Sequence, residues 1–190
     1  MTTFQAHTLE TAPEGSRDTL EAVKKAFGGI PNLFAVFSES PAIASAYLSL
    51  GQLFDTASGF DATERQVVLL STSFENECEY CMAAHSAISK MQQVPDDVVQ
   101  SLRLGEPLAD PKLEALRTFT LAVVRGRGHV DPAGVQAFLD AGYTNRAVLD
   151  VILGVGIKTL SNYTNHLAKT ELDANFAPFA WSKPAPATTV

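Results

Sequence analysis

Pro, Gly and Asp residues divide this chain into segments whose apolar residues recur at helical spacing, and this pattern restricts the fold more than any other feature. In the segment 16–27 apolar side chains recur at intervals of three and four residues, and Gly28 and Gly29 end it. No segment alternates apolar and polar residues with period two over a convincing length. We therefore predict an all-α fold of about eight helices. The other helices are expected at 41–56, from 61 towards the two cysteines, and at 79–92, 95–105, 110–126, 133–141 and 144–170.

Several of these helices have recognisable start signals. Pro41, Pro111 and Pro132 stand where a first helical residue is expected, because proline lacks the N–H that a helix start leaves unpaired. Asp61 with Glu64 three residues later has the spacing of a capping box. These signals place helix starts with more certainty than the apolar spacing alone.

With 190 residues the chain is long enough for one sizeable core, and we expect residues 1–176 to form a single domain. Three prolines among small and polar residues make 177–190 an expected extended C-terminal tail. Aromatic residues near this boundary fit two interpretations, folding back on their own subunit or latching a neighbour, and the sequence favours neither. They are Phe176, Phe179 and Trp181.

Charge and hydropathy exclude several classes of partner. The formal net charge is −7 and no run of Lys and Arg is long enough to hold a phosphate backbone, so we expect no nucleic-acid partner. The longest nearly apolar run, 147–157, contains Asp150 and is far shorter than the roughly 20 residues of a membrane span. The N-terminus has neither the basic nor the apolar region of a secretory signal. We expect a soluble, cytoplasmic protein with no membrane partner.

The two cysteines of the chain, Cys78 and Cys81, are followed by His85. On a helix these three positions share a face, which brings a thiol pair within reach of a base. Because a reducing cytosol keeps thiols free, a lone C-x-x-C there is more plausibly catalytic or metal-binding than structural. We therefore identify Cys78, Cys81 and His85 as the candidate catalytic residues.

Only a thiolate attacks a peroxide or a disulfide, so one sulfur must be held as an anion. A helix start near Cys78 favours that sulfur, whereas His85, one turn beyond Cys81, favours the second. We predict that Cys81 attacks, because a positioned base both accepts the proton and holds the anion. Cys78 then resolves the sulfenic acid by forming a disulfide.

Three other interpretations of the cysteines compete with this one. Zinc binding would need a fourth ligand such as His7, His129 or His166, and the chain has no second C-x-x-C. Plain core packing would leave the histidine unexplained. A structural disulfide would close a loop too short to constrain the unfolded chain. We expect no metal and no cofactor.

Three stretches together resemble the carboxymuconolactone decarboxylase superfamily, and within it the alkylhydroperoxidase AhpD-like branch. The central one runs from Thr63 through the cysteines to His85, and the others support it. The resemblance implies an AhpD-like helical bundle that assembles into trimers or hexamers. It also implies a thiol peroxidase whose substrate is a hydroperoxide and whose reductant is an unidentified dithiol. The supporting stretches are 29–34 and 162–167.

The resemblance further implies a proton relay in which His85 works with a glutamate about a dozen residues before the first cysteine. This chain departs from that pattern, because Gln66 stands there and Glu64 lies about 160° away around the helix. A glutamine forms hydrogen bonds but does not carry a proton as a carboxylate does. Either another acid takes over or the relay is weakened.

His166 and Asn162 form an i, i+4 polar pair on an otherwise apolar helix. The pair is either a contact next to the thiols or a satisfied buried pair, and we favour the second interpretation slightly. Two alternatives to the peroxidase remain for the whole chain. One is a cofactor-free enzyme like the superfamily's namesake decarboxylase, and the other is a non-catalytic redox sensor.

Overall fold

The computed structural model describes residues 4–185, and over that range it contains nine α-helices, one short 3-10 helix and no strand. The predicted all-α class is confirmed over this range. None of these helices combines the length and the apolar character that crossing a bilayer requires. The helices are α1 Glu14–Phe27, α2 Asn32–Phe37, α3 Pro41–Ala57, α4 Ala62–Glu75, α5 Glu79–Met91, α6 Asp96–Leu104, α7 Pro111–Arg125, α8 Pro132–Asp140, α9 Asn145–Ala168 and the 3-10 helix η1 Ala174–Phe179.

The start signals read from the sequence act as capping groups. Asp61 accepts a hydrogen bond from the backbone N–H of Glu64, whose side chain accepts one from the N–H of Asp61, so the capping box of α4 is confirmed. Asp110 and Asp131 accept from backbone N–H groups in the first turns of α7 and α8. These caps fix where the central helices begin.

Helix α2 was not predicted from the sequence. Its six residues follow Pro31, and five of them are buried, so the segment shows no polar face from which a period could be read. A single short turn of helix between Pro31 and Ser38 is stabilised by burial rather than by propensity.

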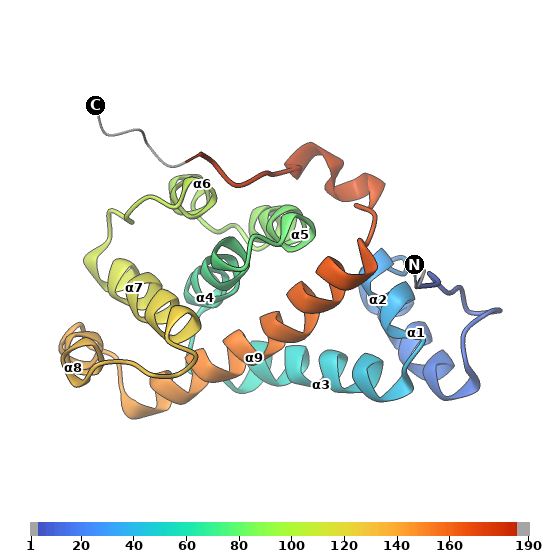
Figure 1. The fold of residues 1–190 in the computed structure, drawn as a ribbon, viewed down its shortest axis with the longest axis horizontal. Coiled ribbons are helices and arrows are strands. Elements are labelled where there is room, and N and C mark those ends of the chain that lie inside the picture. Colours follow the sequence, from blue (N-terminus) through green and yellow to red (C-terminus); the bar gives the residue numbers. More distant parts are fainter. Residues whose placement is uncertain (1–3, 186–190) are drawn as a thin grey trace.

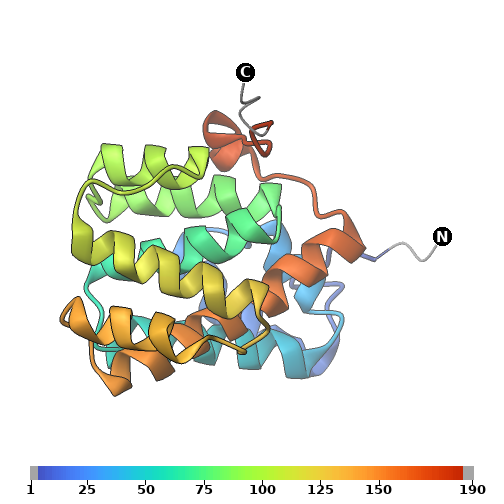
Figure 2. The same cartoon turned by 60° about the vertical axis from the view of Figure 1, so that its left-hand side comes forward.

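Helix α4 lies at the centre of the bundle, where it packs on α5, α6, α7 and α9. Both ribbon views show α5 and α6 above α4 and α7, with α3, α8 and much of α9 below them (Figures 1 and 2). Burial on nearly all sides explains why α4 carries apolar residues around most of its circumference.

Helix α9 crosses the molecule beside α3 and beneath α4 (Figure 1). It approaches both helices closely at Gly154, where an added Cβ would lie 2.6 Å from Cγ1 of Val68 and 3.0 Å from Cζ of Phe54. A glycine is required here because a larger residue would push α9 away from both neighbours. Four residues later α9 carries the buried Lys158, and the helix also packs on α5.

The C-terminal segment folds back over α5 (Figure 1), with η1 packed against that helix. Phe176 meets the ring of Tyr80 edge-on, and Trp181 lies beside Phe74 while its Nε1 donates to the carbonyl of Arg103 over 2.7 Å. These two aromatic side chains thus make contacts within their own chain. Residues 186–190 of the expected 177–190 tail lie outside the described residues.

Candidate active site

The two cysteines stand at the turn between α4 and α5. Helix α4 ends, Glu77 takes a left-handed conformation (φ 56°), and the N–H of Cys78 bonds the carbonyl of Ser73 over 2.9 Å. Cys78 is therefore the N-cap of α5, and Cys81 lies in its first turn. Both thiols are free, and each residue is 1% exposed.

Helix α9 supplies the polar groups that face the sulfurs. Nδ2 of Asn165 lies 3.3 Å from Sγ of Cys81 and 3.6 Å from Sγ of Cys78, and Oγ of Ser161 lies 3.6 Å from Sγ of Cys81. Lys158, Ser161 and Asn165 follow one another at i, i+3 and i+7, so they share the face of α9 that looks at α5. All three residues are buried.

Lys158 is a cation in the interior. Its residue is 1% exposed, and its ammonium has no hydrogen-bond partner among the described residues. Burying an ammonium without a counter-charge is costly, so the site must supply negative charge nearby. Burial alone would lower the pKa of Lys158, but the neighbouring acidic groups outweigh it, Cys81 first and then Tyr47 and Cys78, and raise that pKa.

The site separates the two thiols by their acidity. Burial raises the pKa of the Cys81 thiol, but the protonated Cys78 thiol, the Lys158 ammonium and the Ser161 hydroxyl outweigh burial and hold that pKa well below its ordinary value. The pKa of Cys78 moves the other way, because its proton is shared with Cys81 and because it is largely buried beside that negative charge. These directions make Cys81 the more acidic thiol of the pair.

His85 does not bind either sulfur. Its Nδ1 lies 3.0 Å from Oε1 of Gln66. Because an amide oxygen only accepts, the ring proton is on Nδ1. Nε2 of Gln66 in turn donates to Oε1 of Gln92 over 3.0 Å. Burial and the nearby charge of Lys158 hold the pKa of His85 well below its ordinary value. A neutral ring carries no positive charge to balance a thiolate, so the part of His85 in proton transfer stays a prediction. The cation beside Cys81 is Lys158.

Glu64, the second candidate for the relay, is occupied elsewhere. Its Oε1 accepts from the hydroxyl of Tyr143 over 3.1 Å and from Nζ of Lys112 over 3.0 Å, while Oε2 caps α4 at Asp61. Its position around α4 keeps it away from His85, as the helical geometry required. Gln66 is the residue of α4 that reaches His85.

His166 is exposed, and the buried pair expected for it does not form. Its expected partner, Asn162, instead accepts from Nδ2 of Asn76 over 2.9 Å. The residue of this turn that reaches the sulfurs is Asn165, one position earlier, because that position points into the bundle.

No three His, Cys, Asp or Glu side chains come together as a possible metal group within residues 4–185. His85 is turned to Gln66, and the other histidines proposed as zinc ligands do not join the two cysteines. The geometry therefore gives the zinc interpretation no ligand set in this range.

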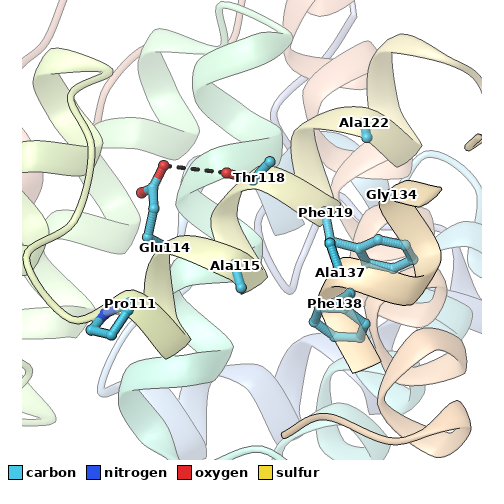
Figure 3. A pocket seen from close by; sticks show the side chains of 9 residues that line it. All are labelled: Pro111, Glu114, Ala115, Thr118, Phe119, Ala122, Gly134, Ala137 and Phe138. Carbon is cyan, nitrogen blue, oxygen red and sulfur yellow. Dashed lines mark hydrogen bonds between the residues drawn. The ribbon is translucent and has the colours of Figure 1, made fainter. Parts of the chain in front are cut away.

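A pocket of about 320 Å³ lies between α7 and α8 (Figure 3), and none of the residues that face the sulfurs lines it. Its single charged lining residue, Glu114, bonds Thr118 and Arg117. Its walls are otherwise mostly apolar side chains, so this pocket offers no nucleophile and no free base.

Sequence reasoning missed the contribution of α9 and of Tyr47 on α3. One signal was available, because Lys158 is a lone cation just after the nearly apolar run 147–157, and Ser161 and Asn165 follow it at helical spacing. A lysine on the buried side of a helix needs a reason to be there. That reason, the thiolate of α5, lies too far away in sequence for any helical period to show it.

A Gln66→Glu variant is expected to raise the pKa of His85 by about one unit or more, because it places a carboxylate at the Nδ1–H that now meets an amide. The amide of Gln92 can turn to donate to the new carboxylate. The measurement is an NMR titration of the imidazole C–H signals, with the His85 signal assigned from a His85→Gln variant. Gln52→Glu, which adds the same charge at an exposed position of α3, is the control. An unchanged His85 titration would contradict the placement of Gln66.

Comparisons with known proteins agree with the fold. Residues 41–105 match the model of the carboxymuconolactone decarboxylase family, and no curated protein matches the chain. One solved structure is described as the alkylhydroperoxidase AhpD core and comes from an uncharacterized peroxidase-related protein of Ralstonia eutropha JMP134. It has a TM-score of 0.80 at 21% identity, and the match covers 93% of this chain and 96% of that chain. A peroxidase-related protein from Silicibacter sp. TM1040 has a TM-score of 0.76 at 17% identity, covering 92% and 95%.

A third solved structure is a Cys-to-Ala variant of the debrominase Bmp8 in complex with 2,3,4-tribromopyrrole. It has a TM-score of 0.79 at 16% identity, covering 94% of this chain and 96% of that one. At these identities the structural likeness establishes the fold. The predicted resemblance to the carboxymuconolactone decarboxylase family is confirmed over residues 41–105, and the fold is shared with structures described as AhpD-like.

Proposed function

We propose that this chain is a thiol-dependent peroxidase that reduces hydroperoxides. The proposal starts from the similarity of the chain to the carboxymuconolactone decarboxylase superfamily and its AhpD-like proteins. The observation that carries the proposal is the asymmetry of the dithiol. Cys81 is held as a thiolate by groups on α9, while Cys78, whose Sγ shares Asn165 with it, keeps its proton. A nucleophilic sulfur beside a protonated one is the arrangement that a two-cysteine peroxidase cycle needs.

The cycle balances as follows. The Cys81 thiolate attacks the outer oxygen of a hydroperoxide, the O–O bond breaks, and the remaining oxygen leaves with the electron pair and takes up a proton as an alcohol or water. Cys81 is then a sulfenic acid. Cys78 attacks that sulfur, water leaves, and a Cys78–Cys81 disulfide forms. An external dithiol returns both sulfurs to the reduced state by thiol–disulfide exchange.

The assignment of roles follows from acidity. The attacking sulfur must be ionised, and the resolving sulfur must wait until a sulfenic acid is present. A raised pKa keeps Cys78 out of the first step, and the neighbouring position allows it to act in the second. The lactone chemistry of the enzyme that names the superfamily does not need a dithiol. It would therefore leave Cys78 and Cys81 without a role.

The proposal predicts that reduced protein treated with one equivalent of hydroperoxide loses both free thiols and gains one disulfide. Alkylation followed by mass spectrometry of the peptide that contains both cysteines measures thiol number, pairing and stoichiometry together. The control is protein alkylated before the hydroperoxide is added, which should consume none. Two free thiols after an excess of hydroperoxide would overturn the proposal. Conversion of a lactone acid that survives alkylation would favour the namesake chemistry.

A further inference from the structure

The peroxidase cycle leaves one requirement open, which is the source of the proton for the leaving oxygen. In the relay that the resemblance implied, a carboxylate and an imidazole move that proton. Here Gln66 carries no proton, and the Nδ1–H of His85 is engaged by the amide oxygen of Gln66. The low pKa of His85 keeps its ring neutral, so no imidazolium is present to donate.

Lys158 is the buried cation of this site, and no Asp or Glu forms an ion pair with it among the described residues. The titratable groups that affect it or are affected by it are Cys78 before α5, Cys81 and His85 on α5, and Tyr47 on α3. Of these, only the thiolate of Cys81 supplies the negative charge that a buried ammonium requires.

The position of Lys158 is built into the fold. It lies one turn after Gly154, where α9 contacts α4 and α3 too closely to admit a Cβ. Ser161 and Asn165, on the same face of α9, are the residues that reach Sγ of Cys81. The ammonium is therefore carried by the helix face that already binds the attacking sulfur.

We propose that Lys158 is both the counter-ion of the Cys81 thiolate and the proton donor to the leaving oxygen of the hydroperoxide, in place of the carboxylate–imidazole relay that Gln66 interrupts. This inference rests on the proposed peroxidase function. The resemblance to the superfamily did not indicate a catalytic role for this buried lysine.

The step balances in protons and electrons. The thiolate gives an electron pair to the outer oxygen, the O–O bond breaks, and the leaving alkoxide takes a proton from the Lys158 ammonium to become an alcohol. Cys81 is then a sulfenic acid and Lys158 a neutral amine. Cys78 condenses with the sulfenic acid and releases water without any change in charge.

Charge balance supports this assignment at the end of the cycle as well. A disulfide carries no charge, so a Lys158 that kept its proton would be a buried cation without any counter-charge. A Lys158 that has given its proton away is neutral, as the disulfide is. Reduction by the external dithiol restores the thiolate and the ammonium together, so the interior stays neutral in both states.

The test replaces Lys158 by Met, which has a similar length and no charge, in the full chain. We expect the thiol titration of Cys81, followed by the ultraviolet absorbance of the thiolate against pH, to move up to the ordinary value of about 8.5 or above. At neutral pH, we expect disulfide formation in a single turnover to slow by about 100-fold or more, because both the thiolate and the proton donor are lost. Lys25→Met, at an exposed position of α1, is the control and should change neither quantity.

The two roles separate at high pH. At a pH of about 9.5 most of Cys81 is ionised in the variant while Lys158 still carries its proton in the parent, so a remaining deficit of about tenfold or more measures proton donation. Equal rates there would overturn the donor role, and an unmoved Cys81 titration would overturn the counter-ion role. A circular-dichroism melt checks that Lys158→Met folds; Lys158→Gln serves the same purpose should Met not be accommodated.

The parent protein shows which proposal has failed. If the parent forms no Cys78–Cys81 disulfide with hydroperoxide, the peroxidase function itself is wrong, whatever the variant does. If the parent forms the disulfide and Lys158→Met matches it in both titration and rate, the peroxidase stands and the task given to Lys158 is wrong.

Discussion

Hydroperoxide consumption is expected to fall by at least about a thousandfold in a Cys81→Ser variant, which removes the one ionised nucleophile of the site. A serine hydroxyl stays protonated beside Lys158 and is not oxidised by a peroxide, so neither the attack nor the disulfide is possible. Serine is close to cysteine in size, and its hydroxyl can still bond Asn165 and Ser161. The fold should therefore be retained. The measurement is the rate of hydroperoxide loss with a dithiol reductant in excess.

The matched control is Ser86→Cys, which introduces a thiol of similar burial on α5 outside the pair. It should keep the parent rate, since a thiol elsewhere on the helix takes no part in the cycle. A Cys81→Ser protein that consumed hydroperoxide at the parent rate would show that Cys81 is not the attacking sulfur. If Cys78 in that variant became oxidised as fast as the parent pair, the two roles would have to be exchanged.

A Cys78→Ser variant is expected to complete the first step and then stop. Cys81 keeps Lys158, Ser161 and Asn165 around it, and a hydroxyl at position 78 can donate to the thiolate as the thiol did, so attack on hydroperoxide should proceed at close to the parent rate. No thiol remains to resolve the sulfenic acid. We expect a burst of one equivalent followed by steady-state turnover reduced by about 100-fold or more.

The product of that burst is the decisive measurement. Protein quenched into denaturant with dimedone should carry the adduct on Cys81, located by mass spectrometry of the tryptic peptide. Denaturant is needed because the sulfur is almost wholly buried. The Cys81→Ser variant treated in the same way is the control and should carry no adduct at position 81. An unchanged steady state would mean that Cys78 does not resolve the intermediate, and a sulfenic acid at no cysteine would mean that Cys81 is not oxidised.

Much of the fold could be predicted because its signals are local. The capping box of Asp61 and Glu64 and the prolines at the starts of α7 and α8 each act within one turn of helix, so their effect is visible in the sequence. Helix α2 was not visible in this way, since six mostly buried residues show no period.

The candidate site was predicted in part. The sequence brought Cys78, Cys81 and His85 together because helical spacing relates residues that are three or four positions apart. From the sequence we predicted that His85, the histidine within that distance, stabilises the Cys81 thiolate. In the structure Gln66 engages the imidazole, burial and the charge of Lys158 lower its pKa, and we propose Lys158 as the counter-ion instead.

The sequence by itself determined that the chain is helical, where most helices begin, and that two thiols meet at the start of one of them. Only the tertiary structure decided which groups surround those thiols. Ser161 and Asn165 contact Cys81 across separations of 80 and 84 residues, and Lys158 comes from the same helix face. A sequence period reports the neighbours of a residue on its own helix, whereas the charge that ionises Cys81 arrives from another helix by packing, through the approach that Gly154 permits.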